Sequence, residues 1–383
     1  MNRPVYLDYN ATTPVAAEVV EAMLPYLVEH FGNPSSSHPY GRKAAEAVRE
    51  ARASVALLLG AAAKEIVFTG SATEANNLAL LGVARALAGA KRHLVVSAVE
   101  HPAVIEPALH LQREGWNLSV VPVDVYGRVD PSDIAAALRP DTALVSIMHA
   151  NNEVGTIQPI AEIAAITRKR GVLLHTDAAQ SAGKIPVDVG ALGVDLLTLA
   201  GHKFYAPKGV GALYVRTGTP IKPIQFGADQ ERRLVPGTEN VLQMVGLGAA
   251  ARLARERLPA ATQKLRALRD ALHEQLVARV PDLKLNGHPT ERLPTTLHVS
   301  FPGIAGRELL SRVAGQVAAS VGSACHSQAD AVSGVLAAMG CDVNRALGAV
   351  RLSVGWMTTL EEIEAAAKAL AEGLGSSPMR RRQ

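Results

Sequence analysis

Short apolar runs alternate with helical patterns between residues 65 and 215, and this alternation constrains the fold more than any other feature of the chain. Each run is apolar at successive positions, which is typical of strands covered on both faces. Strands that alternate with helices in this way form a mainly parallel sheet flanked by helices. The sequence therefore predicts an α/β fold, with strands at 65–69, 94–97, 118–123, 143–148, 172–176, 195–199 and 210–215.

The pattern changes in the last third of the chain. A helical pattern from about Ala249 to Val280 contains Pro259, which predicts either a break or a new helix start there. Four shorter strands and three helices follow, and they indicate a smaller α+β domain that the N-terminal segment is expected to join. We therefore predict a large domain at 15–256 and a small domain made of 1–14 and 257–383. The four strands are expected at 283–285, 296–301, 317–320 and 350–354.

The composition excludes several classes of protein. Of the 383 residues 48% are hydrophobic and 19% charged, which suits a globular protein with two full cores. The net charge is only +4, too small to indicate a nucleic-acid or membrane partner. The sequence has no stretch of transmembrane length and no signal-peptide core, so we expect a cytoplasmic protein. Two cysteines without a Cys-x-x-Cys pair exclude a thiol-rich site within one chain, and no metal is predicted.

Two polar segments follow predicted strands and carry the groups that pyridoxal 5'-phosphate requires. The segment HTDAAQSAGK occupies 175–184, and AGHK occupies 200–203. Enzymes that use this cofactor bind its aldehyde through a lysine and keep its pyridine nitrogen protonated with an acid. Asp177 and Lys203 are the candidates for these two roles. The pair predicts carbanion chemistry at the α-carbon of an amino acid.

A third segment supplies a candidate phosphate site. The strand at 65–69 leads into Gly-Ser-Ala-Thr-Glu at 70–74 and then into an apolar helical pattern. Ser71 and Glu74 have the spacing of a capping box, which marks the N-terminus of a helix. Backbone N–H groups at a helix start bind phosphate, although an ordinary capped helix has the same spacing.

Cys325 and Arg351 stand out from their surroundings. Cys325 lies among small and polar residues with His326 beside it, which indicates an exposed loop and a candidate thiolate nucleophile. Cys341 is interpreted as an ordinary buried cysteine or a loop residue. Arg351 lies in a short apolar run, where an arginine requires an anionic partner.

The sequence resembles the cysteine desulfurases of the class V aminotransferase family, the NifS/IscS-like enzymes, from about Tyr6 to about Glu362. The resemblance implies a fold type I pyridoxal-phosphate enzyme that forms a homodimer. Ten collinear segments carry it: YLDYNATTPV (6–15), FGNPSSSH (31–38), SATEANN (71–77), EHPAV (100–104), HANNEVGTIQPI (149–160), HTDAAQSAGKIPVDV (175–189), GHKFYAPKGVGALYVR (201–216), PGTEN (236–240), SVGSACHS (320–327) and AVRLSVG (349–355).

The resemblance also implies a role for individual residues. Lys203 carries the cofactor, His101 stacks on its ring and transfers protons, and Cys325 accepts the sulfur of L-cysteine as a persulfide. Arg351 clamps the substrate carboxylate, with Asn152 as a second substrate contact. The remaining cofactor contacts fall on Asn152 and Gln180 at the ring oxygen, Asp177 at the ring nitrogen, and Ala72, Thr73, His202 and Thr238 at the phosphate.

Thr238 is implied to reach the phosphate from the partner subunit, which makes the homodimer obligate. Ala200 departs from the family, because most desulfurases have a serine there whose hydroxyl binds phosphate. The lost hydrogen bond is worth on the order of 1 kcal/mol. Either cofactor affinity is lowered, or Thr198 or a water molecule replaces that contact.

The sequence favours a desulfurase that delivers sulfur to an acceptor protein such as an iron–sulfur scaffold, and three other functions share part of its pattern. A selenocysteine lyase shares the fold and cofactor, and SVGSACHS, HKFYAPKG and ERRLVPGTEN resemble its segments. An aminotransferase or kynureninase needs no thiol, which the Cys325 segment argues against. A non-catalytic sulfur-relay scaffold predicts erosion of the catalytic residues, yet all of them are present.

Overall fold

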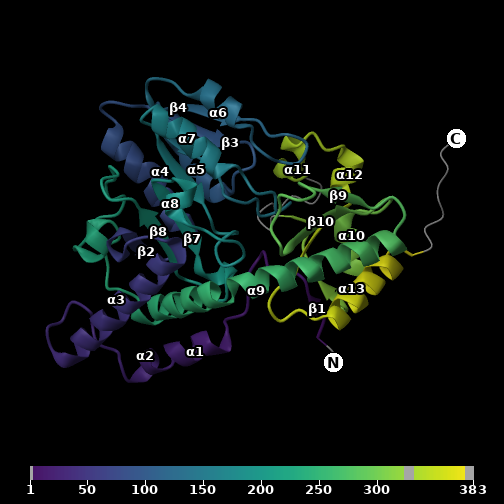
Figure 1. Cartoon of the computed structure of the whole chain (residues 1–383), viewed down its shortest axis with the longest axis horizontal. Helices are drawn as coiled ribbons and strands as arrows, with labels where there is room; N and C mark the ends of the chain where they lie inside the picture. Colours follow the sequence, from purple (N-terminus) through teal and green to yellow (C-terminus); the bar gives the residue numbers. More distant parts are fainter. Residues whose placement is uncertain (1–2, 323–331, 376–383) are drawn as a thin grey trace.

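The computed structural model describes residues 3–322 and 332–375, and its centre is a seven-stranded sheet (Figure 1). The strand order is β2-β8-β7-β6-β5-β3-β4, and only β8 runs antiparallel to its neighbours. The mainly parallel sheet is therefore confirmed. Its strands are β2 (Ile66–Thr69), β3 (His93–Ser97), β4 (Asn117–Val121), β5 (Thr142–Ser146), β6 (Leu173–Asp177), β7 (Leu196–Ala200) and β8 (Gly211–Val215).

Helices cover both faces of this sheet. One core cluster joins the sheet to α3 (Pro39–Leu59), α7 (Ile160–Lys169) and the first half of α9 (Val241–Arg279). A second cluster joins the opposite face to α4 (Ala72–Leu87) and α5 (Pro102–Arg113). The shorter helices of this part are α1 (Ala17–Met23), α2 (Pro25–Val28), α6 (Pro131–Ala137) and α8 (Val189–Leu192), with 3₁₀ turns at Ala63–Glu65, Gly201–Lys203 and Gln230–Arg233.

A smaller α+β unit packs at the other end of α9. Its sheet pairs β10 (Thr296–Ser300) antiparallel with β9 (Lys284–Asn286) and β12 (Ala349–Ser353). The N-terminal strand β1 (Val5–Tyr6) pairs with β11 (Val317–Ala318), and Leu7 is buried in the core of this unit. The division at 15–256 stays a prediction.

The described residues contain four helices beyond α9, where the sequence predicted three. They are α10 (Gly306–Arg312), α11 (Gly334–Ala338), α12 (Val343–Leu347) and α13 (Leu360–Gly373). The predicted number is one too low, and α11 and α12, with five residues each, are too short to display a helical period.

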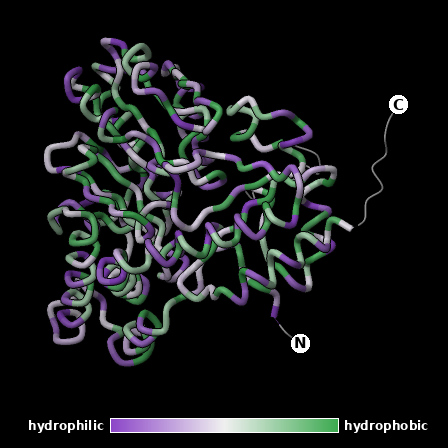
Figure 2. Tube along the Cα trace, turned by 45° about the vertical axis from the view of Figure 1, so that its right-hand side comes forward, coloured by the Kyte–Doolittle hydropathy of each residue, from purple (hydrophilic) through white to green (hydrophobic). Residues whose placement is uncertain are grey.

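Helix α9 continues through Pro259, so the predicted break or restart was wrong. The helix has 39 residues and connects the two units (Figure 1). Proline removes one backbone hydrogen bond, but Pro259 is exposed and the buried face continues on both sides of it. Along the helices the trace in Figure 2 passes repeatedly between hydrophobic and hydrophilic residues, as expected for helices that bury one face. Within 3–322 and 332–375, no helix combines the length and apolar character needed to cross a membrane.

Candidate active site

A cavity of about 440 Å³ lies beyond the carboxyl ends of the central strands. Asp177 is the last residue of β6, Ala200 is the last residue of β7, and Arg351 enters from β12. Ligands of open parallel sheets bind at this edge, because the loops that follow neighbouring strands meet there. The predicted site residues that line the cavity are Ala72, Thr73, His101, Asn152, Asp177, Gln180, His202, Lys203 and Arg351.

Of the predicted site residues that the structure describes, Thr238 alone is not among those that line the cavity. Thr238 is exposed and lies in the segment before α9. Cys325 lies outside the residues that the structure describes. Cys341, the other cysteine, is half-buried, and burial raises the pKa of its thiol.

The carboxylate of Asp177 is fixed by two hydrogen bonds. Its Oδ2 accepts from Asn76 Nδ2 at 2.7 Å, and its Oδ1 accepts from the backbone N–H of Ala179 at 2.9 Å. Asp177 and Asn76 are both buried. The sequence reasoning missed Asn76, although it lies four residues after Ala72 and therefore on the same face of α4.

The amine of Lys203 is held by the N-terminal segment. Nζ donates to the backbone oxygens of Asn10, at 2.7 Å, and Ala11, at 2.8 Å. Asn10 is fully buried and was also missed, although it lies within the motif YLDYNATTPV. Since Lys203 follows β7 and Asp177 ends the neighbouring parallel strand β6, the amine and the carboxylate face one cavity.

The N-terminus of α4 faces the same cavity. Ser71 caps the helix by accepting from the N–H of Glu74 at 3.1 Å, so the predicted helix start is confirmed. The N–H groups of a first turn have no partner within the helix and can bind an anion. Gly211 of β8 permits this placement, because a Cβ there would lie 2.9 Å from the nitrogen of Ala72.

Two basic side chains add to this anion-binding end. His202 shares a hydrogen bond of 3.1 Å between its Nδ1 and Thr12 Oγ1. Burial, together with the charges of Lys203 and Lys208, lowers the pKa of His202 to about 4, so the ring is neutral at pH 7. Lys208 also lines the cavity and was missed in the sequence.

Ala200 lines the cavity, as its position after β7 requires. Thr198 does not line it, and its hydroxyl bonds to the ring of His175 at 3.1 Å. The expectation that Thr198 replaces the serine hydroxyl was therefore wrong. The two side chains share a face of β7, but Thr198 lies one step deeper in the sheet.

His101 caps α5 with its own ring. Its Nδ1 accepts from the N–H of Ala103 at 3.1 Å, which places the proton of the neutral ring on Nε2. Burial lowers the pKa of His101, the charge of Lys203 lowers it further, and Asp177 opposes the shift. A neutral ring in this position can stack on a planar ligand or pass a proton.

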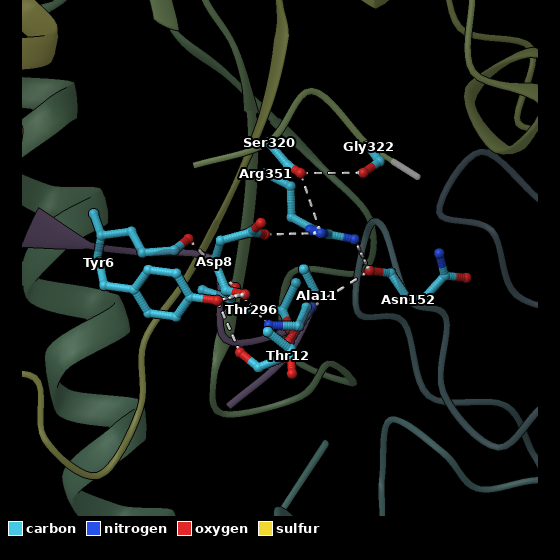
Figure 3. Close-up of polar contacts among 12 residues, drawn as sticks. Tyr6, Asp8, Ala11, Thr12, Asn152, Thr296, Ser320, Gly322 and Arg351 are labelled. Carbon is cyan, nitrogen blue, oxygen red and sulfur yellow. Dashed lines mark hydrogen bonds and ion pairs between the residues drawn. The ribbon is translucent and has the colours of Figure 1, made fainter. Parts of the chain in front are cut away.

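Arg351 has the anionic partner that its apolar surroundings require. Its Nη2 donates to Asp8 Oδ1 at 2.9 Å and to Ser320 Oγ at 3.3 Å, and its Nη1 donates to the backbone oxygen of Asn152 at 2.9 Å (Figure 3). The Nε of Arg351 is buried and has no hydrogen-bond partner among residues 3–322 and 332–375. In Figure 3 the side-chain amide of Asn152 points away from the guanidinium.

These residues fit pyridoxal 5'-phosphate. A buried carboxylate, a lysine amine and a helix N-terminus face one cavity, and they match the pyridine nitrogen, the aldehyde and the phosphate of that cofactor. Arg351 adds a guanidinium, which suits the carboxylate of an amino acid.

Comparisons with known proteins agree with this chemistry. Residues 5–366 match the family model described as aminotransferase class-V. The cysteine desulfurase IscS of Dictyoglomus turgidum is 46% identical over 364 residues, which cover 95% of this chain and 92% of that protein. The IscS of an Anaeromyxobacter species is 47% identical over 375 residues, covering 97% and 93%. A solved NifS-like protein superposes with a TM-score of 0.92 and 39% identity, over 97% of this chain and 99% of that one.

Proposed function

Since the chain belongs to the class V aminotransferase family and is a pyridoxal-phosphate-dependent cysteine desulfurase, we propose which of its residues carry the reaction. The observation that carries the assignment is the convergence of Asp177, Lys203 and Arg351 on one cavity. When bound, the cofactor supplies an electron sink that stabilises negative charge at the α-carbon of an amino acid.

Three groups of the chain bind and orient the cofactor in this proposal. The N–H groups of Ala72 and Thr73 bind its phosphate together with His202, and Thr238 is contributed by the second subunit. Asp177 holds a proton at the pyridine nitrogen, and its two hydrogen bonds keep the carboxylate in place. His101 stacks on the ring, while Gln180 and Asn152 contact the ring oxygen.

The substrate is held and deprotonated by two basic residues. Arg351 binds the carboxylate of L-cysteine. Its buried Nε supports this role because no described residue accepts its N–H, which is therefore left for a ligand. Asn152 gives a second contact. Lys203 removes the α-proton, for which its amine must leave the carbonyl oxygens of Asn10 and Ala11.

Cys325 receives the sulfur. Its thiolate attacks the substrate sulfur, so that an S–S bond forms as the C–S bond breaks. The electron pair of the broken bond stays with the carbon skeleton, which becomes alanine after protonation. The persulfide on Cys325 then passes to a sulfur-acceptor protein, for example a scaffold for iron–sulfur cluster assembly.

A homodimer completes the proposed site. Exposed apolar side chains between α2 and the start of α3 support it, because Val28 is 73% exposed and Phe31 is 70% exposed and stacks on Tyr40. Exposed apolar side chains that cluster in this way indicate a protein interface. The cytoplasmic location stays a prediction.

The assignment is tested by alanine release from L-cysteine and L-selenocysteine, run side by side with a thiol reductant. We expect turnover of L-cysteine that is abolished by Lys203→Ala and by Cys325→Ala, with bound cofactor retained in the second variant. Desulfuration at the parent rate by Cys325→Ala would refute the acceptor role. Turnover of L-selenocysteine alone would favour the selenocysteine lyase, which the comparisons do not favour.

A further inference from the structure

Lys184 is a buried lysine beside the active site to which the proposed reaction gives no role. Its side chain is 5% exposed, and its Nζ donates to Gln180 Oε1 at 2.7 Å and to Asn10 Oδ1 at 3.2 Å. Within 3–322 and 332–375, both hydrogen-bond acceptors of this amine are neutral amide oxygens. Burying a lysine against amides alone costs free energy, so its presence calls for a reason other than stability.

Lys184 determines which way the amide of Gln180 points. With Oε1 taken by Lys184, Gln180 Nε2 donates to the backbone oxygen of Asn10 at 2.9 Å. If the amide were flipped, its NH₂ would face the lysine amine and its oxygen would face the Asn10 oxygen. Two donors would then oppose each other on one side and two acceptors on the other.

The fixed amide leaves one N–H available to the cavity. An amide NH₂ has two hydrogens, and the Asn10 oxygen takes one of them. Gln180 lines the cavity, so the second hydrogen is the group that it can offer to a ligand. The same Asn10 oxygen accepts from Lys203, which ties the two lysines to one backbone group.

We propose that Lys184 is a positioning residue that fixes Gln180 so that the cofactor's ring oxygen meets an N–H donor rather than a carbonyl oxygen. The inference rests on the proposed function, in which Gln180 contacts that oxygen. A donor stabilises the ring oxygen as an anion, whereas an acceptor destabilises it.

The arrangement does not require a charged lysine. Burial lowers the pKa of Lys184, and the charges of Lys203 and Arg351 lower it further. A neutral amine keeps two N–H groups, which is the number needed for Gln180 and Asn10. Lys184 therefore keeps its bond to Gln180 Oε1 in either charge state, and the Asn10 oxygen opposes a flip of the amide in both.

The first test is Lys184→Met, reconstituted with pyridoxal 5'-phosphate. We expect cofactor affinity to fall about tenfold, as for the loss of one hydrogen bond to a charged group. The pH midpoint of the bound cofactor's visible absorbance change should rise by about one unit, since the anionic ring oxygen loses a donor. Lys264→Met is the matched control. Lys264 is exposed and donates to the Trp356 backbone oxygen, so the cofactor affinity and the pH midpoint should both stay at the parent values. An unchanged midpoint in Lys184→Met would overturn the proposal.

A double-variant cycle shows whether the effect acts through Gln180. Adding Lys184→Met to Gln180→Leu should change the affinity less than about twofold, since coupled residues are not additive. A full further loss in that background would overturn the proposal. Lys184→Arg keeps an N–H donor for Gln180, so its pH midpoint should match that of the parent rather than that of Lys184→Met.

A second variant covers the case in which Lys184→Met fails to fold. Gln180→Glu keeps an acceptor for Lys184 but presents only oxygen to the cavity, so the pH midpoint of the cofactor's absorbance change should rise. An unchanged pH midpoint would contradict the proposal that the ring oxygen meets an N–H donor of Gln180. Lys203→Ala separates this inference from the proposed function. If that variant keeps the visible band of the bound cofactor, the proposed function fails; if the band is lost while Lys184→Met matches the parent, only this inference fails.

Discussion

Replacing Arg351 with methionine separates the binding of the substrate carboxylate from the stability of the fold. The guanidinium is 4% exposed and pairs with Asp8, whose side chain is 21% exposed. A hydrogen bond to a charged group contributes about 1.5–3 kcal/mol, so two bonds to a carboxylate contribute about 3–6 kcal/mol. At tenfold per 1.4 kcal/mol, kcat/KM for L-cysteine should fall by roughly 100- to 10,000-fold in Arg351→Met.

The same substitution leaves Asp8 without its cation. Breaking a fully buried ion pair costs about 3–5 kcal/mol, and the partial exposure of Asp8 reduces this to about 1–2 kcal/mol. Urea unfolding of the cofactor-free protein measures that loss. Adding Asp8→Asn removes the unpaired charge, so the double variant should regain most of the stability.

Steady-state kinetics on the two variants then decide whether Arg351 acts on the substrate or only on the stability of the fold. The double variant should keep the low kcat/KM, because stability returns while the carboxylate still has no guanidinium. Lys203 is unchanged in both variants, so cofactor loading should match the parent and serves as the control. The reasoning is refuted if folded Arg351→Met stays within about threefold of the parent rate, or if Asp8→Asn restores that rate.

Two further predictions concern the neighbourhood of the cofactor. A Cβ on Gly211 would lie 2.7 Å from the carbonyl carbon of Ser71, so Gly211→Ala should displace the start of α4. Reconstitution with the cofactor should then show an affinity more than tenfold weaker than that of the parent. Gly315→Ala is the control and should bind the cofactor normally, because a Cβ there meets nothing within 4 Å. Burial raises the pKa of Glu100 from 4.5 to about 8, and the charge of Asp177 adds to the rise. Between pH 4.5 and about pH 8 the folded protein therefore binds one proton more than the unfolded chain, and its stability falls as the pH rises through this range. Glu100→Gln should flatten this part of the stability profile of the cofactor-free protein, and an unchanged slope would contradict the shift.

The sequence was most informative where chemistry and periodicity coincide. The strand ends that carry Asp177 and Lys203 could be located because each apolar run stops at a polar residue, and parallel strands bring such ends together. The need of Arg351 for an anion also followed from its apolar surroundings, but the identity of that anion did not. Asp8 lies 343 residues away in the chain, and no local pattern connects the two.

What the sequence did not reveal depends on tertiary contacts. Asn10 and Lys184 belong to quoted motifs, yet their roles follow from hydrogen bonds that form only when the N-terminal segment crosses the cavity. The continuation of α9 past Pro259 has a similar cause, since burial of leucines on both sides of the proline outweighs its poor helix propensity. The short helices α11 and α12 are fixed by their caps rather than by a period.

The N-terminal strand has a consequence for how the enzyme is made. Val5 and Tyr6 pair with residues 317 and 318, and Asp8 bonds to Arg351, so this segment is synthesised long before its partners. At translation speeds of about 5–20 residues per second, the 343 residues between Asp8 and Arg351 take roughly 20–70 seconds. The central sheet can form during this delay, while the end of the cavity where Arg351 is proposed to bind substrate is completed only after residue 351 has emerged. A nascent chain that has not reached this residue therefore lacks the proposed contact to the substrate carboxylate.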